Sequence, residues 1–91
     1  MARLKIMYRI LPKDTEDSTI DKIIDEINSR AVNLGYIFDG YKIEPIAFGL
    51  NSIKVLLTFE DENSNTLNIF EQFLDDLDLI SSWEVIAMSR C

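Results

Sequence analysis

A chain of 91 residues fits one domain with one modest core, so we treat residues 1–91 as a single domain. It contains no histidine and one cysteine, Cys91, which removes the commonest general base and metal ligand and excludes an internal disulfide. The formal net charge of −7 disfavours binding to a nucleic-acid backbone. We find neither a signal peptide nor an apolar run of membrane-spanning length, so we expect a cytoplasmic protein.

The first third of the sequence predicts a strand and a helix. Strict alternation of apolar residues over residues 3–11 is typical of a half-buried strand. An apolar stripe at helical spacing predicts a helix over residues 18–34, capped by Asp17 or Ser18 and ended by Gly35. The expected inward positions are Leu4, Ile6, Tyr8 and Ile10 in the strand and Ile20, Ile23, Ile24, Ile27, Ala31 and Leu34 in the helix.

The rest of the chain predicts three more strands and one more helix. We place a strand over residues 36–43, in which Gly40 could mark a bulge, and a second over residues 51–60. A helix over residues 66–78 and a strand over residues 82–88 follow. In the last strand we expect Val85 and Ala87 on one face and Ile86 and Met88 on the other.

This order, β-α-β-β-α-β, predicts the fold class. It indicates an α+β protein with a ferredoxin-like split β-α-β sandwich, in which two helices cover one face of a four-stranded antiparallel sheet. We place the first and last strands together in the centre of the sheet.

The segment that joins the two middle strands, residues 44–50, is unusually apolar for a surface connection. Pro45 fixes one φ angle, and Gly49 permits a sharp turn beside the aromatic ring of Phe48. Two interpretations remain open. Phe48 could fold back into the core, as its residue type favours, or it could stand on a stiff loop as an anchor for a partner.

Other candidate sites are weaker. RNA binding by stacking would use Tyr8 with the basic residues of the first strand, but the chain as a whole is acidic. Residues 61–65 begin like a calcium loop and then depart from its pattern, so we interpret them as a turn. The acidic group at residues 75–78 is interpreted as a solvated helix end, although acids there oppose the helix dipole. Trp83 is interpreted as a packing residue.

Two segments of the sequence resemble archaeal elongation factor 1-beta, a family of guanine-nucleotide exchange factors. Residues 44–50 read Glu-Pro-Ile-Ala-Phe-Gly-Leu, as in the apolar loop of that family. Residues 87–91 read Ala-Met-Ser-Arg-Cys and are similar to its C-terminus, where eukaryotic members carry Ala-Met-Gln-Lys-Leu or a close variant. The resemblance covers the whole chain in length and element order.

The resemblance implies a translation factor that binds elongation factor 1-alpha, the GTPase that carries aminoacyl-tRNA, and exchanges its GDP for GTP. It implies a partner-binding set of Pro45, Ile46, Phe48, Gly49 and Arg90, in which the Phe48 ring enters a pocket of the GTPase. Arg90 would disturb the magnesium and phosphate site, although it stands where the eukaryotic pattern has lysine, and the two cations differ in shape. No catalytic residue, cofactor or resident metal is implied, so the protein is not expected to be an enzyme.

We further expect the free protein to be a monomer, with no direct contact to nucleic acid or membrane. The alternative function is a ferredoxin-like domain that senses a small molecule or binds another protein, with dimerisation through an edge strand. Exposure of Phe48 in the isolated fold discriminates between the exchange factor and this alternative.

Overall fold

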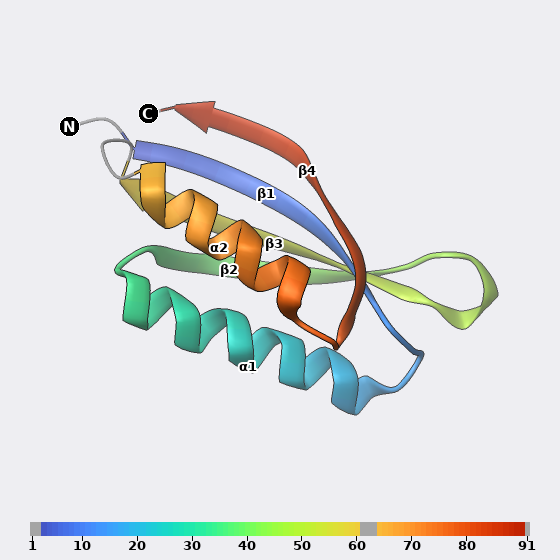
Figure 1. Ribbon diagram of the computed structural model, residues 1–91. Helices are drawn as coiled ribbons and strands as arrows, with labels where there is room; N and C mark the ends of the chain where they lie inside the picture. The colour runs from blue at the N-terminus through green and yellow to red at the C-terminus, as the bar shows by residue number, and fades with distance from the viewer. Residues whose placement is uncertain (1–2, 61–63, 91) are drawn as a thin grey trace.

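The computed structural model describes residues 3–60 and 64–90, and Figure 1 shows their arrangement. The elements follow the order that the sequence predicts, with bounds that differ from the predicted ones by at most two residues. They are β1 (Arg3–Pro12), α1 (Asp17–Leu34), β2 (Ile37–Pro45), the 3-10 turn Ala47–Gly49, β3 (Asn51–Glu60), α2 (Ser64–Asp76) and β4 (Ile80–Arg90). The first part of the turn predicted after β3, residues 61–63, lies outside the described residues.

The four strands form one antiparallel sheet in the order β2-β3-β1-β4. This confirms the ferredoxin-like fold, but the predicted position of the last strand is wrong, because β4 lies at an edge of the sheet. The hairpin connection already pairs β3 with β2 on one side, and β1 occupies its other side. β4 therefore pairs with the remaining side of β1, and this places β4 at the edge of the sheet.

The core lies between the sheet and the two helices, which cover the same face of the sheet (Figure 1). The inward positions predicted for β1 are all buried. Of those predicted for α1, Ile20, Ile23, Ile27 and Ala31 are buried, whereas Ile24 and Leu34 are half-buried at the edge of the core. Rings from three strands or loops meet the α2 ring Phe70, which is fully buried; these rings are Tyr8, Tyr36 and Phe59. Within the described residues, neither helix has the length and apolarity needed to cross a membrane.

The start of α1 differs from the prediction. In the described part of the chain the N-cap position belongs to Glu16, which makes no side-chain cap hydrogen bond, so capping by Asp17 or Ser18 was wrong. The reason lies in the preceding turn, where the Asp14 carboxylate accepts a hydrogen bond of 3.0 Å from the Glu16 N–H. Hydrogen bonds from the Thr19 side chain and from that N–H hold the pKa of Asp14 below its usual value.

The two structural roles predicted for glycines are confirmed. Gly35 ends α1 in the left-handed conformation at φ 78°, and its N–H donates to the carbonyl of Ala31 over 2.9 Å. Gly40 follows a shift in the pairing register of β2 with β3, between Phe38 and Gly40, as expected for a bulge.

The predicted faces of β4 are wrong because a second register shift was not anticipated. Val85 pairs with Tyr8 and Ala87 pairs with Met7, so two residues of β4 advance while β1 advances by one. Tyr8 and Met7 are neighbours on β1 and point to opposite faces, and antiparallel partners share a face. Val85 and Ala87 therefore lie on opposite faces, with Ile86 between them at the bulge.

Candidate partner-binding surface

The β2–β3 hairpin ends in a compact, ordered turn. The N–H of Ile46 donates to the carbonyl of Leu50 over 2.8 Å, and the N–H of Leu50 donates to the carbonyl of Ala47 over 3.2 Å. These two bonds close the 3-10 turn Ala47–Gly49, and the hairpin projects past the ends of both helices (Figure 1). The predicted loop residues are thereby brought together at one end of the molecule.

Phe48 occupies the tip of this turn, and its side chain is almost fully in solvent, with 97% of the residue exposed. The core interpretation of Phe48 was therefore wrong. Its backbone has φ 62° and ψ 31°, a left-handed conformation that costs a residue with a β-carbon about 1 kcal/mol or more. Gly49 follows at φ 77°, where glycine carries no such cost. A costly backbone conformation thus presents an exposed aromatic ring.

The base of the hairpin is held on the face opposite the helices. The Lys54 ammonium lies 2.5 Å from a carboxylate oxygen of Glu44, across β3 and β2. The fully buried Ser52 hydroxyl donates to the backbone carbonyl of Glu44 over 3.3 Å. The hydrogen bond from Lys54 lowers the pKa of the Glu44 carboxyl, so this carboxylate stays ionised at a lower pH than is usual for glutamate. These contacts fix the direction in which the hairpin points.

The other predicted partner-binding residue, Arg90, lies at the opposite end of the sheet. It is the last residue of β4, and its backbone pairs with Leu4 near the start of β1. From Leu4 to Ile10 and on to the tip of the hairpin, strand geometry gives a separation of roughly 35 Å. This agrees with a long axis of 43 Å for the molecule, and Figure 1 shows the end of β4 and the hairpin tip at opposite ends. The structure therefore does not bring Phe48 and Arg90 together.

Comparison with known families decides the family of the chain. The profile of the EF-1 guanine nucleotide exchange domain matches residues 5–91, which is nearly the whole chain. The chain belongs to the EF-1 guanine nucleotide exchange domain family. The resemblance first seen in the hairpin loop and the C-terminal segment is thus confirmed.

Curated relatives match this exchange domain over almost their full length. Elongation factor 1-beta of Staphylothermus marinus is 29% identical over 90 residues, covering 99% of this chain and 98% of that protein. Elongation factor 1-beta of Korarchaeum cryptofilum is 30% identical over 90 residues, covering 99% and 95% of the two chains.

Among solved structures, the C-terminal domain of the MgtC protein from Mycobacterium tuberculosis resembles the exchange domain with a TM-score of 0.65. It is 9% identical and covers 94% of this chain and 88% of its own. The ACT domain of GTP pyrophosphokinase from Chlorobium tepidum matches with a TM-score of 0.61 at 11% identity, covering 92% and 99%. These likenesses show the fold alone.

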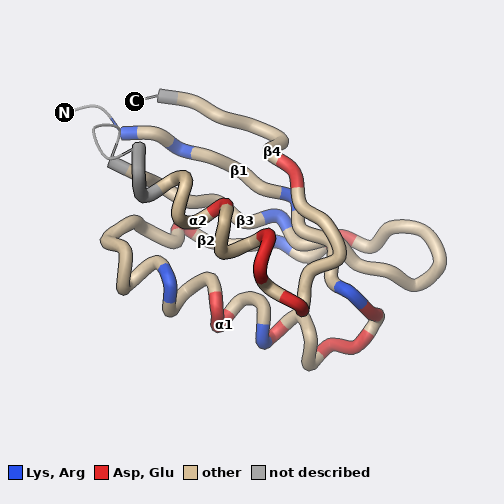
Figure 2. The backbone as a smooth tube through the Cα atoms, viewed as in Figure 1, with Lys and Arg blue, Asp and Glu red and all other residues tan. Residues whose placement is uncertain are grey.

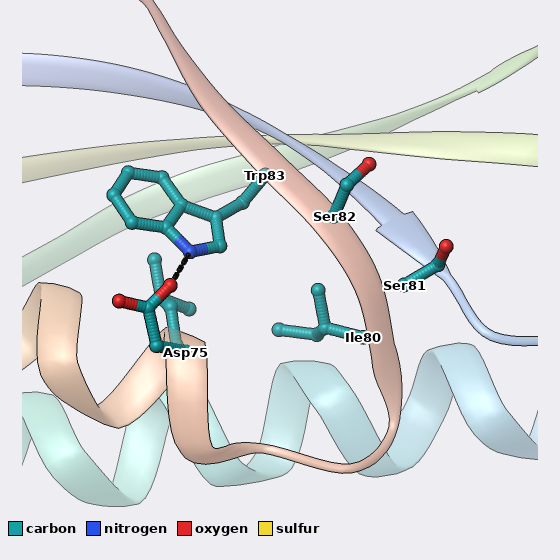
Figure 3. A pocket seen from close by; sticks show the side chains of 6 residues that line it. Asp75, Ile80, Ser81, Ser82 and Trp83 are labelled. Atoms are coloured by element: carbon teal, nitrogen blue, oxygen red, sulfur yellow. Dashed lines mark hydrogen bonds between the residues drawn. The ribbon is translucent and has the colours of Figure 1, made fainter.

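A polar cavity of about 370 Å³ lies where α2 passes into β4 of the exchange domain (Figure 3). The indole N–H of Trp83 donates to the Asp75 carboxylate over 2.8 Å, and the Trp83 ring packs edge-on against Tyr8 with ring centroids 5.7 Å apart. The packing role predicted for Trp83 is confirmed. The hydroxyls of Ser81 and Ser82 point away from Asp75, so no pair of serine and carboxylate is formed between these labelled residues.

The acidic residues at the end of α2 are exposed to solvent, as predicted. Side-chain hydrogen bonds to two of them offset their unfavourable position in the helix dipole. Asp75 accepts the Trp83 bond, and Asp76 accepts a hydrogen bond of 3.2 Å from the Gln72 amide. Across residues 3–60 and 64–90, no group of three or more histidine, cysteine or acidic residues could hold a metal ion. Sequence patterns missed the Trp83–Asp75 bond because it joins an exposed helix residue to a strand by tertiary structure.

RNA stacking on the first strand is also ruled out for its proposed ring. Tyr8 is fully buried on the helix-facing side of β1, and its hydroxyl donates to a Glu71 carboxylate oxygen on α2 over 3.0 Å. Burial, followed by the nearby charge of Glu71, raises the pKa of Tyr8 far above its usual value, so the phenol stays neutral.

The charges of the exchange domain divide between its two faces (Figure 2). On the helices, exposed or half-exposed acids outnumber the cations Lys22 and Arg30, whereas on the strands lysine and arginine outnumber the acids, which include Asp39, Glu44 and Glu84. The helical acids are Asp17, Asp21, Asp25, Glu26, Glu71, Asp75 and Asp76, and the strand cations include Arg3, Lys5, Arg9, Lys42 and Lys54. Arg9 pairs with Glu84 at 3.0 Å, and Lys54 pairs with Glu44, so acids on neighbouring strands offset part of this positive charge. The helical face is therefore the more strongly negative one.

Proposed function

We propose that this domain promotes the exchange of GDP for GTP on elongation factor 1-alpha in the cytoplasm, with Phe48 as its main anchor. The observation that carries the proposal is the 97% exposed ring on a left-handed backbone. A protein gains no folding stability from such a ring, because it buries little apolar surface and its backbone is strained. Buried in a partner pocket, the same ring is the type of residue that dominates interface energies. This exposure favours the exchange factor over the small-molecule sensor.

The two ends of the sheet act on different parts of the GTPase. A ligand pocket of about 300–1,000 Å³ is on the order of 10 Å across, which is too small to receive residues roughly 35 Å apart. We therefore assign Phe48, with Pro45, Ile46 and Gly49, to a pocket distant from the nucleotide. Arg90 at the other end is assigned to the magnesium and phosphate site, where an added cation repels Mg²⁺ and weakens its hold on the phosphates.

Exchange then follows from linkage, with no proton transfer and no covalent step. If the domain lowers the affinity of the GTPase for GDP, then GDP must lower the affinity of the GTPase for the domain by the same ratio. The domain therefore binds the nucleotide-free GTPase more tightly than the GDP-bound form. Tight binding at Phe48 supplies the free energy that the Arg90 end uses to displace Mg²⁺ and GDP. The absence of histidine from the chain is consistent with such a mechanism.

The test is the release of fluorescent GDP from purified elongation factor 1-alpha. Phe48→Ala should weaken the complex by about 2 kcal/mol, which is roughly 30-fold in Kd, because an interface anchor is lost. The melting temperature of the free domain should stay nearly unchanged. Val32→Ala, which removes an apolar residue 77% exposed on α1, is the control and should alter neither quantity. GDP release at the wild-type rate with subsaturating concentrations of the Phe48→Ala domain would refute the anchor.

The role of Arg90 has its own test. Arg90→Gln should slow exchange at saturating concentrations of the domain more than it raises Kd, because the cation acts on Mg²⁺ after docking. Arg90→Lys keeps the charge found in the eukaryotic pattern and should retain most of the activity. If Arg90→Gln leaves the saturated rate unaltered, Arg90 takes no part in the mechanism.

A further inference from the structure

The hairpin carries a second apolar feature on the side of β2 that faces the helix layer. Tyr41 pairs with Val55, and Ile43 pairs with Ile53. Antiparallel partners share a face, so all four side chains point toward the helical side of the sheet. Val55 and Ile53 are fully buried, yet Tyr41 is 53% exposed and Ile43 is 42% exposed. Pro45 is the next residue on this face, paired with Asn51, and it is exposed as well.

The cause of this exposure is the place of β2 at an edge of the sheet, because the β3 partners of Tyr41 and Ile43 are fully buried at the same level. Beyond these residues the hairpin tip projects past the ends of both helices (Figure 1). The apolar pattern of β2 therefore continues outside the layer that covers β3. Edge strands of free proteins usually carry charged residues at such positions, because an apolar edge invites association. Here the charged residues of this half-strand, Lys42 and Glu44, lie on the opposite face instead.

We propose that Tyr41, Ile43 and Pro45 form a side wall of the partner-binding surface, continuous along β2 with the Phe48 tip, and that they dock on an apolar patch of the same GTPase. We call these three residues the β2 stripe. The inference rests on the proposed function and extends the loop set, which already includes Pro45, by Tyr41 and Ile43. The partner patch is expected to be apolar, because the β2 stripe offers exposed apolar side chains that gain free energy when they are buried against apolar surface.

A second copy of this chain fits the β2 stripe less well than the GTPase does. Two copies would each bring a net charge of −7 to the contact and repel each other. Pro45, at the end of the strand, has no N–H to donate to a continued ladder. The Glu44–Lys54 pair and the Ser52 bond to Glu44 hold the hairpin in one direction, so the β2 stripe and the tip reach one partner together.

The chain offers a matched pair of substitutions on the same strand. Ile43→Thr removes an apolar side chain from the β2 stripe, whereas Ile37→Thr removes one of similar exposure, 46%, from the opposite face of β2. Threonine keeps the branching that strands favour, so both variants should fold with similar stability. That is checked by urea unfolding of each free variant.

The readout is the concentration of the domain needed for half-maximal GDP release from elongation factor 1-alpha. Ile43→Thr should raise that concentration about fivefold, and Tyr41→Thr combined with it about twentyfold, with little change in the rate at saturation. The saturated rate is expected to stay because the Arg90 end is not altered. Ile37→Thr should leave both quantities as in the wild type.

The outcomes separate this inference from the proposed function. Wild-type protein that neither binds the GTPase nor releases its GDP overturns both. Wild-type activity with equal values for Ile43→Thr and Ile37→Thr overturns the β2 stripe alone. A wild-type dimer in sedimentation that Ile43→Thr converts to monomer, with half-maximal concentration unchanged, also overturns it and assigns the β2 stripe to self-association.

Discussion

The aromatic core beneath the helices and the tip of the hairpin use the same kind of side chain in opposite environments. Phe70 is fully buried and lies within 6 Å, centroid to centroid, of Tyr8, Tyr36, Phe59 and Phe73. Phe48 is 97% exposed on a left-handed backbone. The difference shows that apolarity serves two ends in this chain. In the core it stabilises the fold, and at the tip it is kept at some cost to the fold and is available to a partner.

The largest effect that separates these two regions is expected in the core. Phe70→Ala should lower the free energy of unfolding by about 3–5 kcal/mol, because it removes a large buried side chain and leaves a cavity among four rings. That is a large part of the total stability of about 5–14 kcal/mol expected for a domain of this size. Urea unfolding monitored by circular dichroism measures the loss.

The same variant sharpens the comparison through its binding. Where the Phe70→Ala domain is still folded, its Kd for elongation factor 1-alpha, corrected for the folded fraction, should match the wild type. Phe48→Ala should show the reverse pattern, with wild-type stability and weak binding. A stable Phe70→Ala domain with impaired binding would mean that the two regions are not separable.

A smaller effect is expected from the backbone of the tip. Phe48→Gly should give a more stable domain than Phe48→Ala, by about 0.5–1 kcal/mol. Glycine avoids a left-handed cost of about 1–2 kcal/mol but has a larger entropy loss on folding of about 0.5–1 kcal/mol. Chemical unfolding of the two variants measures the difference, and both should bind the GTPase weakly because both lack the ring.

The control for this backbone effect lies two residues away. Leu50 has φ −80° and ψ 147°, an extended conformation that any residue adopts. Leu50→Gly should therefore be less stable than Leu50→Ala, which is the opposite order. If glycine is the less stable replacement at both positions, the left-handed strain at Phe48 is absent in solution.

Sequence patterns predicted the fold well because the buried faces of β1, β3 and α1 have clear periodicity. Leu4, Ile6, Tyr8 and Ile10 alternate with polar or flexible residues, so their inward direction could be read directly. The segment Val85–Met88 is apolar at every position, and no glycine or proline marks its bulge, so its faces could not be predicted. There the pairing with β1, a tertiary property, decides the direction of each side chain.

The candidate site was only partly predictable from the sequence. The apolar loop was visible by composition, but the residue type of Phe48 favours burial, and the length of the hairpin that holds it in solvent is set by pairing between β2 and β3. The β2 stripe was hidden for a related reason. Tyr41 and Ile43 look like ordinary inward strand residues until the extent of the helix layer is known.

The smallest effect concerns the ion pair at the base of the hairpin. The pKa of Glu44 is lowered in the folded protein, chiefly by its hydrogen bond from Lys54. A lowered folded pKa means that the pair stabilises the fold above the usual value of 4.5 and that this contribution is lost as the pH falls through the folded pKa. Because the Glu44 side chain is 36% exposed, solvent screens the pair and the gain is small.

Lys54→Met removes this contribution and tests whether the pair holds the hairpin. At pH 7 the variant should be slightly less stable than the wild type, and at pH 3 the difference between them should shrink, as measured by urea unfolding. Lys5→Met removes a cation from β1 that does not act on Glu44 and should show no such change with pH. A difference between Lys54→Met and the wild type that is the same at both pH values would assign it to packing of the lysine stem. The hairpin would then be held, like the core, by contact and hydrogen bonding alone.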